Sequence, residues 1–141
     1  MKPELVQRYI NDGTLRLEWH DFPYLGQESR SAAVAARAAQ EQGKFWKYHD
    51  ILFQNQKGEN SGAFSDENLV AFAEEAGLDV ERFEAALESG EYENVVDEDF
   101  REAQDAGIQG TPSFTINGKP LVGSQPLETF VQAIEAEAGN G

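Results

Sequence analysis

Apolar residues recur at every third or fourth position along most of the chain, which is the spacing of helices with one buried face. The helices that this spacing predicts cover residues 3–11, 29–42, 44–56, 65–77, 79–90 and 92–106, with a final one through residues 127–134. Glycine, a favoured helix cap, follows the predicted ends at Gly43, Gly77, Gly90 and Gly107. The chain is therefore expected to be mainly helical.

One segment near the N-terminus alternates between apolar and polar residues instead. Leu15, Leu17 and Trp19 lie on one side of this pattern and polar residues on the other, until Pro23 interrupts it. The alternation predicts a β-strand over residues 15–22.

A second alternating segment lies in residues 107–123, GIQGTPSFTINGKPLVG. Phe114 and Ile116 alternate with polar residues, and Asn117-Gly118 is a strong signal for a two-residue hairpin turn. The segment is therefore expected to form an antiparallel hairpin. The predicted order of elements is helix, strand, a long helical block, hairpin and helix.

The hairpin has an unusual beginning, because Thr111-Pro112 stands directly before its first strand. Proline cannot donate a ladder hydrogen bond, and the residue before it is pushed toward extended geometry. From these residues alone, Pro112 marks the first residue of a strand or an edge strand. The isomer of the Thr111-Pro112 bond stays open at this point.

The composition narrows the possible partners of the chain. Its 141 residues include 26 acidic and 11 basic ones, which gives a formal net charge of -15. Such a charge repels phosphate backbones and anionic lipids, so nucleic acid is not an expected partner. The acids are spread along the predicted helices, which is typical of a solvated acidic surface, with adaptation to high salt as an alternative. The length fits one domain, or one domain with an insertion.

Several kinds of chemistry lack the residues that they need. The chain has no cysteine, which excludes disulfides, thiolate metal sites and thiol nucleophiles within it. The sequence shows no phosphate-binding loop, no nucleophile-base-acid set and no metal-ligand cluster, so neither a cofactor nor a metal is expected. It contains no apolar run of the roughly eighteen residues that a membrane span needs, and its first residues lack the apolar core of a signal peptide.

The hairpin segment, followed by SQPLETFVQAIEAE, resembles the C-terminal half of the DsbA-like branch of the thioredoxin superfamily. The segment EWHDFPYLGQESRSAAVAARAAQEQGKFWKYHDILFQNQ resembles the second thioredoxin strand of that family, its Phe-Pro bend and the start of its inserted helical domain. The resemblance runs from about Pro3 to Glu137 and implies an α/β thioredoxin-like fold. Residues 1–28 and 107–141 would form the thioredoxin-like domain, and residues 29–106 the inserted helical domain.

The resemblance also implies a role for the loop before the hairpin. In this family a Gly-Thr-Pro or Gly-Val-Pro step forms a cis-proline loop beside the redox site and holds the cysteine-containing segment of a substrate. Gly110, Thr111 and Pro112 would form this substrate clamp, with a cis Thr111-Pro112 bond. The backbone of the residue before the proline could then pair with an extended peptide as though a strand were added.

The redox motif of the family is absent from these residues. The family uses a Cys-x-x-Cys motif at the N-terminus of its first helix, where the helix dipole lowers the thiol pKa. This chain has no cysteine, so no catalytic residue is expected in it. Since the helix over residues 3–11 corresponds to the later part of the redox helix, the first strand and the motif are expected upstream of Met1, a truncation of about 25–30 residues.

The missing first strand would be central in the sheet. Its absence would leave unpaired strand edges, which invite pairing with another chain. The chain is therefore expected either to be a fragment of a longer product or to fill the gap as a homodimer or by strand exchange through the unpaired edge.

The resemblance favours a thiol:disulfide oxidoreductase that exchanges disulfides with cysteine-containing proteins outside the cytoplasm, with the isolated chain inactive. Two alternatives stay open. One is a cysteine-free module that binds extended peptides, and the other is a glutathione-dependent transferase or isomerase of the same fold.

A few other residues are candidates for a site. Glu18 and His20 could transfer protons near the redox region, although exposed strand residues are the simpler interpretation. Trp46, Tyr48 and Phe53 could line a groove, but aromatic residues at helical spacing are more often core, and we expect them to be core.

Overall fold

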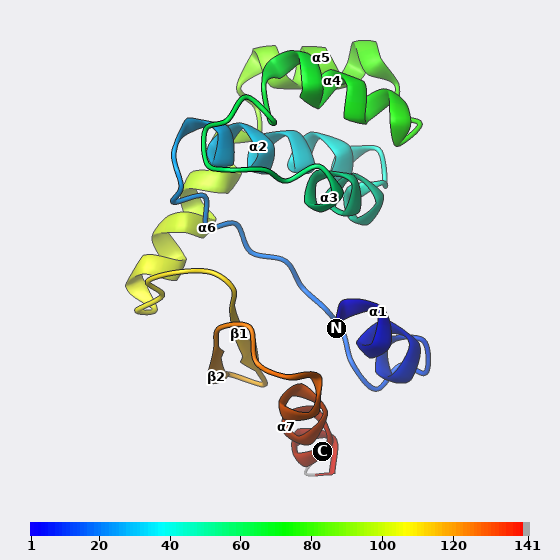
Figure 1. The fold of residues 1–141 in the computed structure, drawn as a ribbon, viewed down its shortest axis with the longest axis vertical. Coiled ribbons are helices and arrows are strands. Elements are labelled where there is room, and N and C mark those ends of the chain that lie inside the picture. The colour runs from blue at the N-terminus through cyan, green and yellow to red at the C-terminus, as the bar shows by residue number, and fades with distance from the viewer. Residues whose placement is uncertain (140–141) are drawn as a thin grey trace. The chain divides into compact units, whose positions relative to one another are not determined.

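The computed structural model of the protein describes residues 1–139. The chain divides into two compact units (Figure 1). Residues Met1–His20 and Ile108–Gly141 form the first, here called the terminal unit, and Asp21–Gly107 form the second, here called the helical unit. The helical unit thus includes residues 21–28, which the family resemblance assigns to the thioredoxin-like domain. The predicted domain boundary at residue 28 stays a prediction.

Five helices build the helical unit: α2 (Gln27–Glu41), α3 (Phe45–Gln54), α4 (Asp66–Glu75), α5 (Val80–Ser89) and α6 (Glu93–Asp105). All five were expected from the spacing of apolar residues, and their ends agree with the prediction within about two residues. Ser65 and Asp79 cap α4 and α5, since their side chains accept hydrogen bonds from the backbone N–H groups of Asn68 and Arg82. The caps supply acceptors that a helix start otherwise lacks.

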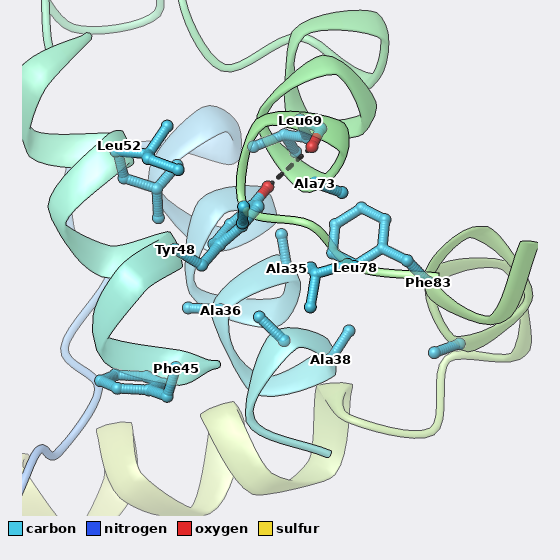
Figure 2. Close-up of a cluster of buried hydrophobic side chains, with 14 residues drawn as sticks. Ala35, Ala36, Ala38, Phe45, Tyr48, Leu52, Leu69, Ala73, Leu78 and Phe83 are labelled. Carbon is cyan, nitrogen blue, oxygen red and sulfur yellow. Dashed lines mark hydrogen bonds between the residues drawn. The ribbon is translucent and has the colours of Figure 1, made fainter. Parts of the chain in front are cut away.

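The core of the helical unit is built around the alanine-rich helix α2 (Figure 2). Small side chains at Ala35 and Ala39 let neighbouring helices approach closely, and both residues are fully buried. Tyr48 of α3 and Phe83 of α5 fill the adjoining space, with ring centroids 5.5 Å apart. The Tyr48 hydroxyl donates to the Leu69 carbonyl at 2.9 Å, which satisfies its polar end. Burial raises the pKa of Tyr48 above its ordinary value.

The prediction that Trp46, Tyr48 and Phe53 are all core residues is wrong for two of them. Tyr48 is buried, whereas Trp46 and Phe53 are 37% and 55% exposed. A helix on the surface of a unit buries only one face, and in α3 that face is filled by Tyr48 and its neighbours. Trp46 and Phe53 lie on the other face, where both rings pack against His49.

The connection between α3 and α4 is tied to the start of α2. The Glu28 carboxylate accepts hydrogen bonds from the N–H groups of Gly62, at 2.6 Å, and Phe64, at 3.2 Å. The Asn60 amide donates to the Leu25 carbonyl at 3.2 Å. We call this set of contacts the Glu28 latch. It holds a polar loop that has no regular secondary structure.

A charged cluster joins the first residue of the helical unit to α2 and α6. Arg37 Nε donates to Asp21 at 2.6 Å, and its terminal nitrogen donates to Asp99 at 2.8 Å. The backbone N–H of Asp21 also donates to Asp99, at 2.9 Å. Asp21 is only 2% exposed and Arg37 11%. A buried guanidinium between two carboxylates thus fixes the beginning of this unit against its last helix.

The terminal unit contains a short helical segment, a hairpin and a final helix. The segment expected over residues 3–11 is helical, as α1 (Lys2–Leu5) followed by a π-helical turn, η1 (Val6–Ile10). The hairpin consists of β1 (Ser113–Ile116) and β2 (Lys119–Val122), and α7 (Leu127–Gly139) follows it. These elements were expected from the sequence, except for the π-helical turn, which no residue pattern predicted.

The hairpin has the register that the Asn117-Gly118 turn requires. Ile116 pairs with Lys119 beside the turn, and Ser113 pairs with Val122 at the open end. Asn117 and Gly118 have φ angles of 49° and 82°, the left-handed pair of a type I′ turn. Asparagine and glycine are the residues that adopt this conformation most readily.

Helix α7 binds the other parts of the terminal unit together. The Phe114 ring of β1 meets the Phe130 ring of α7 edge to face, with centroids 4.8 Å apart. The Tyr9 hydroxyl of η1 donates to Glu135 at 2.7 Å. Lys119 of β2 pairs with Glu137. The helix thus contacts both the hairpin and the N-terminal segment.

The predicted strand over residues 15–22 is wrong. The segment has no regular secondary structure, and the sheet of the described residues consists of β1 and β2 alone. Alternation favours an extended backbone, but a strand exists only when a neighbour accepts and donates its hydrogen bonds. Leu15 donates instead to the Tyr9 carbonyl, at 2.9 Å.

Within residues 1–139, none of the helices combines the length and the apolar character that crossing a membrane requires.

Candidate functional site

The candidate site is the loop that leads into β1. The Thr111-Pro112 peptide bond is cis, as the resemblance to the family implied. The loop is fixed on both sides of Thr111. Ser113 Oγ donates to the Gly110 carbonyl at 2.7 Å, and the Gly123 N–H donates to the Pro112 carbonyl at 2.9 Å. The first bond closes the loop on itself, and the second attaches it to the end of β2.

Thr111 itself presents its backbone to solvent. Thr111 and Pro112 are exposed, whereas Gly110 is half-buried. Across residues 1–139, neither the N–H nor the C=O of Thr111 makes a hydrogen bond. A fixed loop with one unused donor and one unused acceptor on its surface can pair with the backbone of an extended peptide.

The outer edge of β1 continues this arrangement. Because Gly123 donates to Pro112, residues 112 and 123 form a hydrogen-bonded pair, and such pairs alternate along an antiparallel ladder with pairs that are not bonded. Ser113 and Thr115 therefore direct their N–H and C=O groups away from β2. On β2 the corresponding outward positions are Val122 and Pro120, and Pro120 has no N–H. The β1 edge is open and the β2 edge is blunted.

Glu18 and His20 lie together in an exposed charged group. The Glu18 carboxylate contacts the Arg16 guanidinium at 2.5 Å and His20 Nε2 at 3.8 Å. The side chains of Glu18 and His20 are 55% and 64% exposed. The surroundings are those of a solvated surface pair, which contributes little to stability. Their role in proton transfer stays a prediction.

Among residues 1–139, the structure contains no group of three or more His, Cys, Asp or Glu side chains that could hold a metal ion.

Two features of the structure were not foreseen from the sequence. The outward direction of Ser113 and Thr115 follows from the hairpin register, which could have been worked out from the turn position. The sequence contains one sign of the Arg37 cluster, because Arg37 is a lone charge within the alanine-rich run AAVAARAA. A charge on a face that is otherwise apolar needs a buried partner. The identity of the partners, Asp21 and Asp99, could not be read from spacing.

Comparisons with known proteins place the chain in a family. The family profile described as Thioredoxin matches residues 1–136. The chain belongs to the thioredoxin superfamily. Among its relatives, the probable disulfide bond formation protein D of Bacillus cereus is 31% identical over 139 residues. The match covers 96% of this chain and 63% of that protein, so the chain spans less than two thirds of the relative's length.

Solved structures of this superfamily share the fold. Oxidised BdbD from Bacillus subtilis matches with a TM-score of 0.88 at 22% identity, over 97% of this chain and 76% of that one. The thiol-disulfide exchange protein α-DsbA2 from Wolbachia pipientis matches with a TM-score of 0.80 at 25% identity, over 95% and 72%. The α/β fold is therefore that of the DsbA-like thioredoxin proteins, and the chain is a DsbA-like member of the thioredoxin superfamily.

Proposed function

We propose that this chain carries the peptide-binding part of a DsbA-like thiol:disulfide oxidoreductase, with Gly110, Thr111 and Pro112 as the substrate clamp. The observation that carries the proposal is the backbone of Thr111, an exposed residue whose N–H and C=O make no hydrogen bond in the described residues. An extended peptide that pairs with these two groups would have its main chain fixed at the loop.

The exchange reaction itself needs groups that these 141 residues do not contain. A thiolate must attack one sulfur of a disulfide and release the other as the leaving thiolate. Since the chain has no cysteine, both thiols of the catalytic pair would come from outside this sequence. The clamp would hold the substrate, and Glu18 and His20 are the candidates for moving a proton at its thiol.

The substrates of the whole protein would be proteins that contain cysteines. Disulfides persist in oxidising compartments, so an extracytoplasmic location is part of the proposal. The likeness to the disulfide bond formation protein of Bacillus cereus supports this choice of reaction.

Self-association belongs to the proposal as well. The open β1 edge, with Ser113 and Thr115 directed outward, could accept a strand from a second copy of this chain. Such pairing would give a homodimer or a strand-exchanged dimer, and β2 would compete less well because Pro120 lacks one of its two outward N–H groups.

The first prediction tests the clamp through the backbone of Thr111. Thr111→Pro removes the N–H and keeps the carbonyl, whereas Thr111→Val removes only the hydroxyl. Losing one hydrogen bond of about 0.5–1.5 kcal/mol should weaken peptide binding by a factor of about 2 to 13 in Thr111→Pro. Thr111→Val should bind as the parent chain does. Isothermal titration with a short, extended, reduced cysteine peptide measures both dissociation constants.

Two further measurements make the outcome clear. The thermal unfolding midpoint of each variant shows whether the chain remains folded, and amide chemical shifts show whether the peptide perturbs Thr111. Equal binding by Thr111→Pro and the parent, or binding that shifts no amide in the loop, would show that the peptide binds elsewhere.

A further inference from the structure

We infer that this chain, which binds extended cysteine-containing peptides at the clamp of residues 110–112, prefers those with net positive charge. This inference rests on the proposed function and adds the class of substrate. Its basis is the unequal charge of the two units. The helical unit contains 20 acidic and seven basic residues, for a net charge of -13, whereas the terminal unit contains six acidic and four basic residues, for -2.

The charge is concentrated further within the helical unit. From residue 66 to residue 105, which covers α4, α5 and α6, 15 residues are acidic and two are basic. From residue 27 to residue 54, which covers α2 and α3, three are acidic and four are basic. The acidic helices are those drawn in green to yellow in Figure 1. Most of their carboxylates are exposed, so their field extends into the solvent.

The acidic helices are not themselves the binding site. The groups that bind the peptide are the N–H and C=O of Thr111, and main-chain pairing does not distinguish one sequence from another. Near the loop, the exposed residues Thr111, Pro112, Ser124 and Gln125 carry no charge. A preference among peptides must therefore come from other terms, and the net charge of the molecule supplies one of them.

The reach of this field depends on salt. The screening length is about 30 Å at 0.01 M salt, comparable to the diameter of a small domain, and about 8 Å at 0.15 M. At low salt the net charge of the chain therefore acts on a bound peptide over a distance of about the diameter of a small domain. At physiological salt most of this attraction is screened.

The experiment compares three peptides of equal length, each with one reduced cysteine in an extended context. Four flanking positions are all lysine, all glutamine or all glutamate. The lysine peptide should bind most tightly and the glutamate peptide least tightly. We expect the ratio of their dissociation constants to be about tenfold or more at 0.01 M salt and about twofold at 0.15 M.

Charge variants of the chain test whether the preference depends on the carboxylates of the acidic helices. One variant combines Glu84→Gln, Glu88→Gln, Glu98→Gln and Glu102→Gln, four exposed positions on α5 and α6. The matched control replaces the same four residues by aspartate, which keeps the charge. The glutamine variant should narrow the lysine-to-glutamate ratio at low salt, and the aspartate variant should keep it. Circular dichroism melts show that both are folded.

The possible results separate this inference from the proposed function. If the three peptides bind equally at low salt, the charge preference is wrong and the clamp still stands. If the ratio is unchanged in the glutamine variant, the acidic helices are not the source of the preference, and the inference is wrong in that respect while the clamp still stands. If no peptide binds and no loop amide shifts, the clamp is wrong and the preference fails with it.

Discussion

Arg37 is the residue on which the helical unit depends most clearly. It is 11% exposed and binds Asp21 and Asp99, the first of which is 2% exposed. The guanidinium also lies 5.7 Å from the centre of the Phe45 ring. Two carboxylates share one cation here, so removal of the cation leaves negative charges close together in a poorly solvated place.

The second prediction follows from this cluster. Arg37→Leu keeps much of the apolar stem but leaves Asp21 and Asp99 without their cation, and it should lower the free energy of unfolding by about 3–5 kcal/mol. Arg82→Leu removes an arginine that is 59% exposed and lies 3.5 Å from Glu41, and it should change the free energy by less than about 1 kcal/mol. Urea denaturation of both variants gives the comparison. Equal losses of unfolding free energy in the two variants would mean that the Arg37 cluster stabilises the fold no more than the exposed Arg82 pair does.

The third prediction concerns pH and a single carboxylate. The hydrogen bond from Lys119 lowers the pKa of Glu137 from its ordinary value of 4.5. A lowered pKa in the folded state means that the pair stabilises the fold above about pH 4.5 and that this contribution is lost as the pH falls through the folded pKa. Lys119→Met should therefore destabilise the chain more at about pH 7 than at about pH 2.

A titration and a control complete this test. The Glu137 carboxyl resonance should titrate at a higher pH in Lys119→Met than in the parent chain. Arg16→Met changes the net charge by the same amount at an exposed position and should leave the Glu137 titration where it is. A Glu137 titration that does not move in Lys119→Met would contradict the assignment of the pKa shift to this pair.

At the scale of elements, the hairpin edges differ in what they offer a partner. Ser113 and Thr115 direct their backbone groups outward from β1, and Pro120 leaves β2 without one of the corresponding donors. The difference arises from the register, because a shift by one residue would place Pro120 in the ladder instead of on the edge.

The fourth prediction uses this difference. Thr115→Pro removes an outward N–H from β1 without removing a bond between β1 and β2, so it should weaken any dimer that forms through this edge. Val122→Pro removes an outward N–H from β2 instead, and it should leave such a dimer intact. Sedimentation equilibrium over a range of concentrations measures both. If the two variants self-associate to the same extent, the β1 edge is not the interface.

The sequence predicted elements well wherever local signals were sufficient. Helix caps at Ser65 and Asp79 and the turn at Asn117-Gly118 depend on residues a few positions apart, and the elements that they bound appear as expected. The cis Thr111-Pro112 bond was likewise expected, from the resemblance of contiguous residues to the family. The open N–H and C=O of Thr111, however, became visible only in the structure.

The failures share a physical cause. The alternation of Leu15, Leu17 and Trp19 describes an extended backbone but cannot supply the neighbouring strand that makes it part of a sheet. Helical spacing placed Trp46 and Phe53 among the core residues, although only the packing of whole helices decides which face of α3 is covered. In both cases the missing information is tertiary.

At the scale of the whole molecule, the net charge of -15 opposes compactness. Most of it belongs to residues 66–105, where 15 carboxylates lie on three consecutive helices and their connections. Repulsion among like charges destabilises a folded chain, and salt screens that repulsion.

The fifth prediction is that sodium chloride stabilises this chain. Between about 0.05 M and 1 M salt, the thermal unfolding midpoint should rise by several degrees as the screening length falls to about 3 Å. In the variant with glutamine at positions 84, 88, 98 and 102, the unfolding midpoint should rise by less. In the matched aspartate variant it should rise as much as in the parent chain. A midpoint that is independent of salt would show that the carboxylates do not repel one another strongly.

The Glu28 latch has a consequence for how the backbone could be cut. Residues 56–62 are exposed and would be open to a protease, yet Glu28 holds Gly62 and Phe64, and Asn60 holds Leu25. A nick at Lys57 or Gly58 would therefore leave the later part of the loop fastened to α2, and the buried rings of Tyr48 and Phe83 would still join the two pieces. The helical unit could in this way be supplied as two complementary fragments that assemble without a continuous backbone.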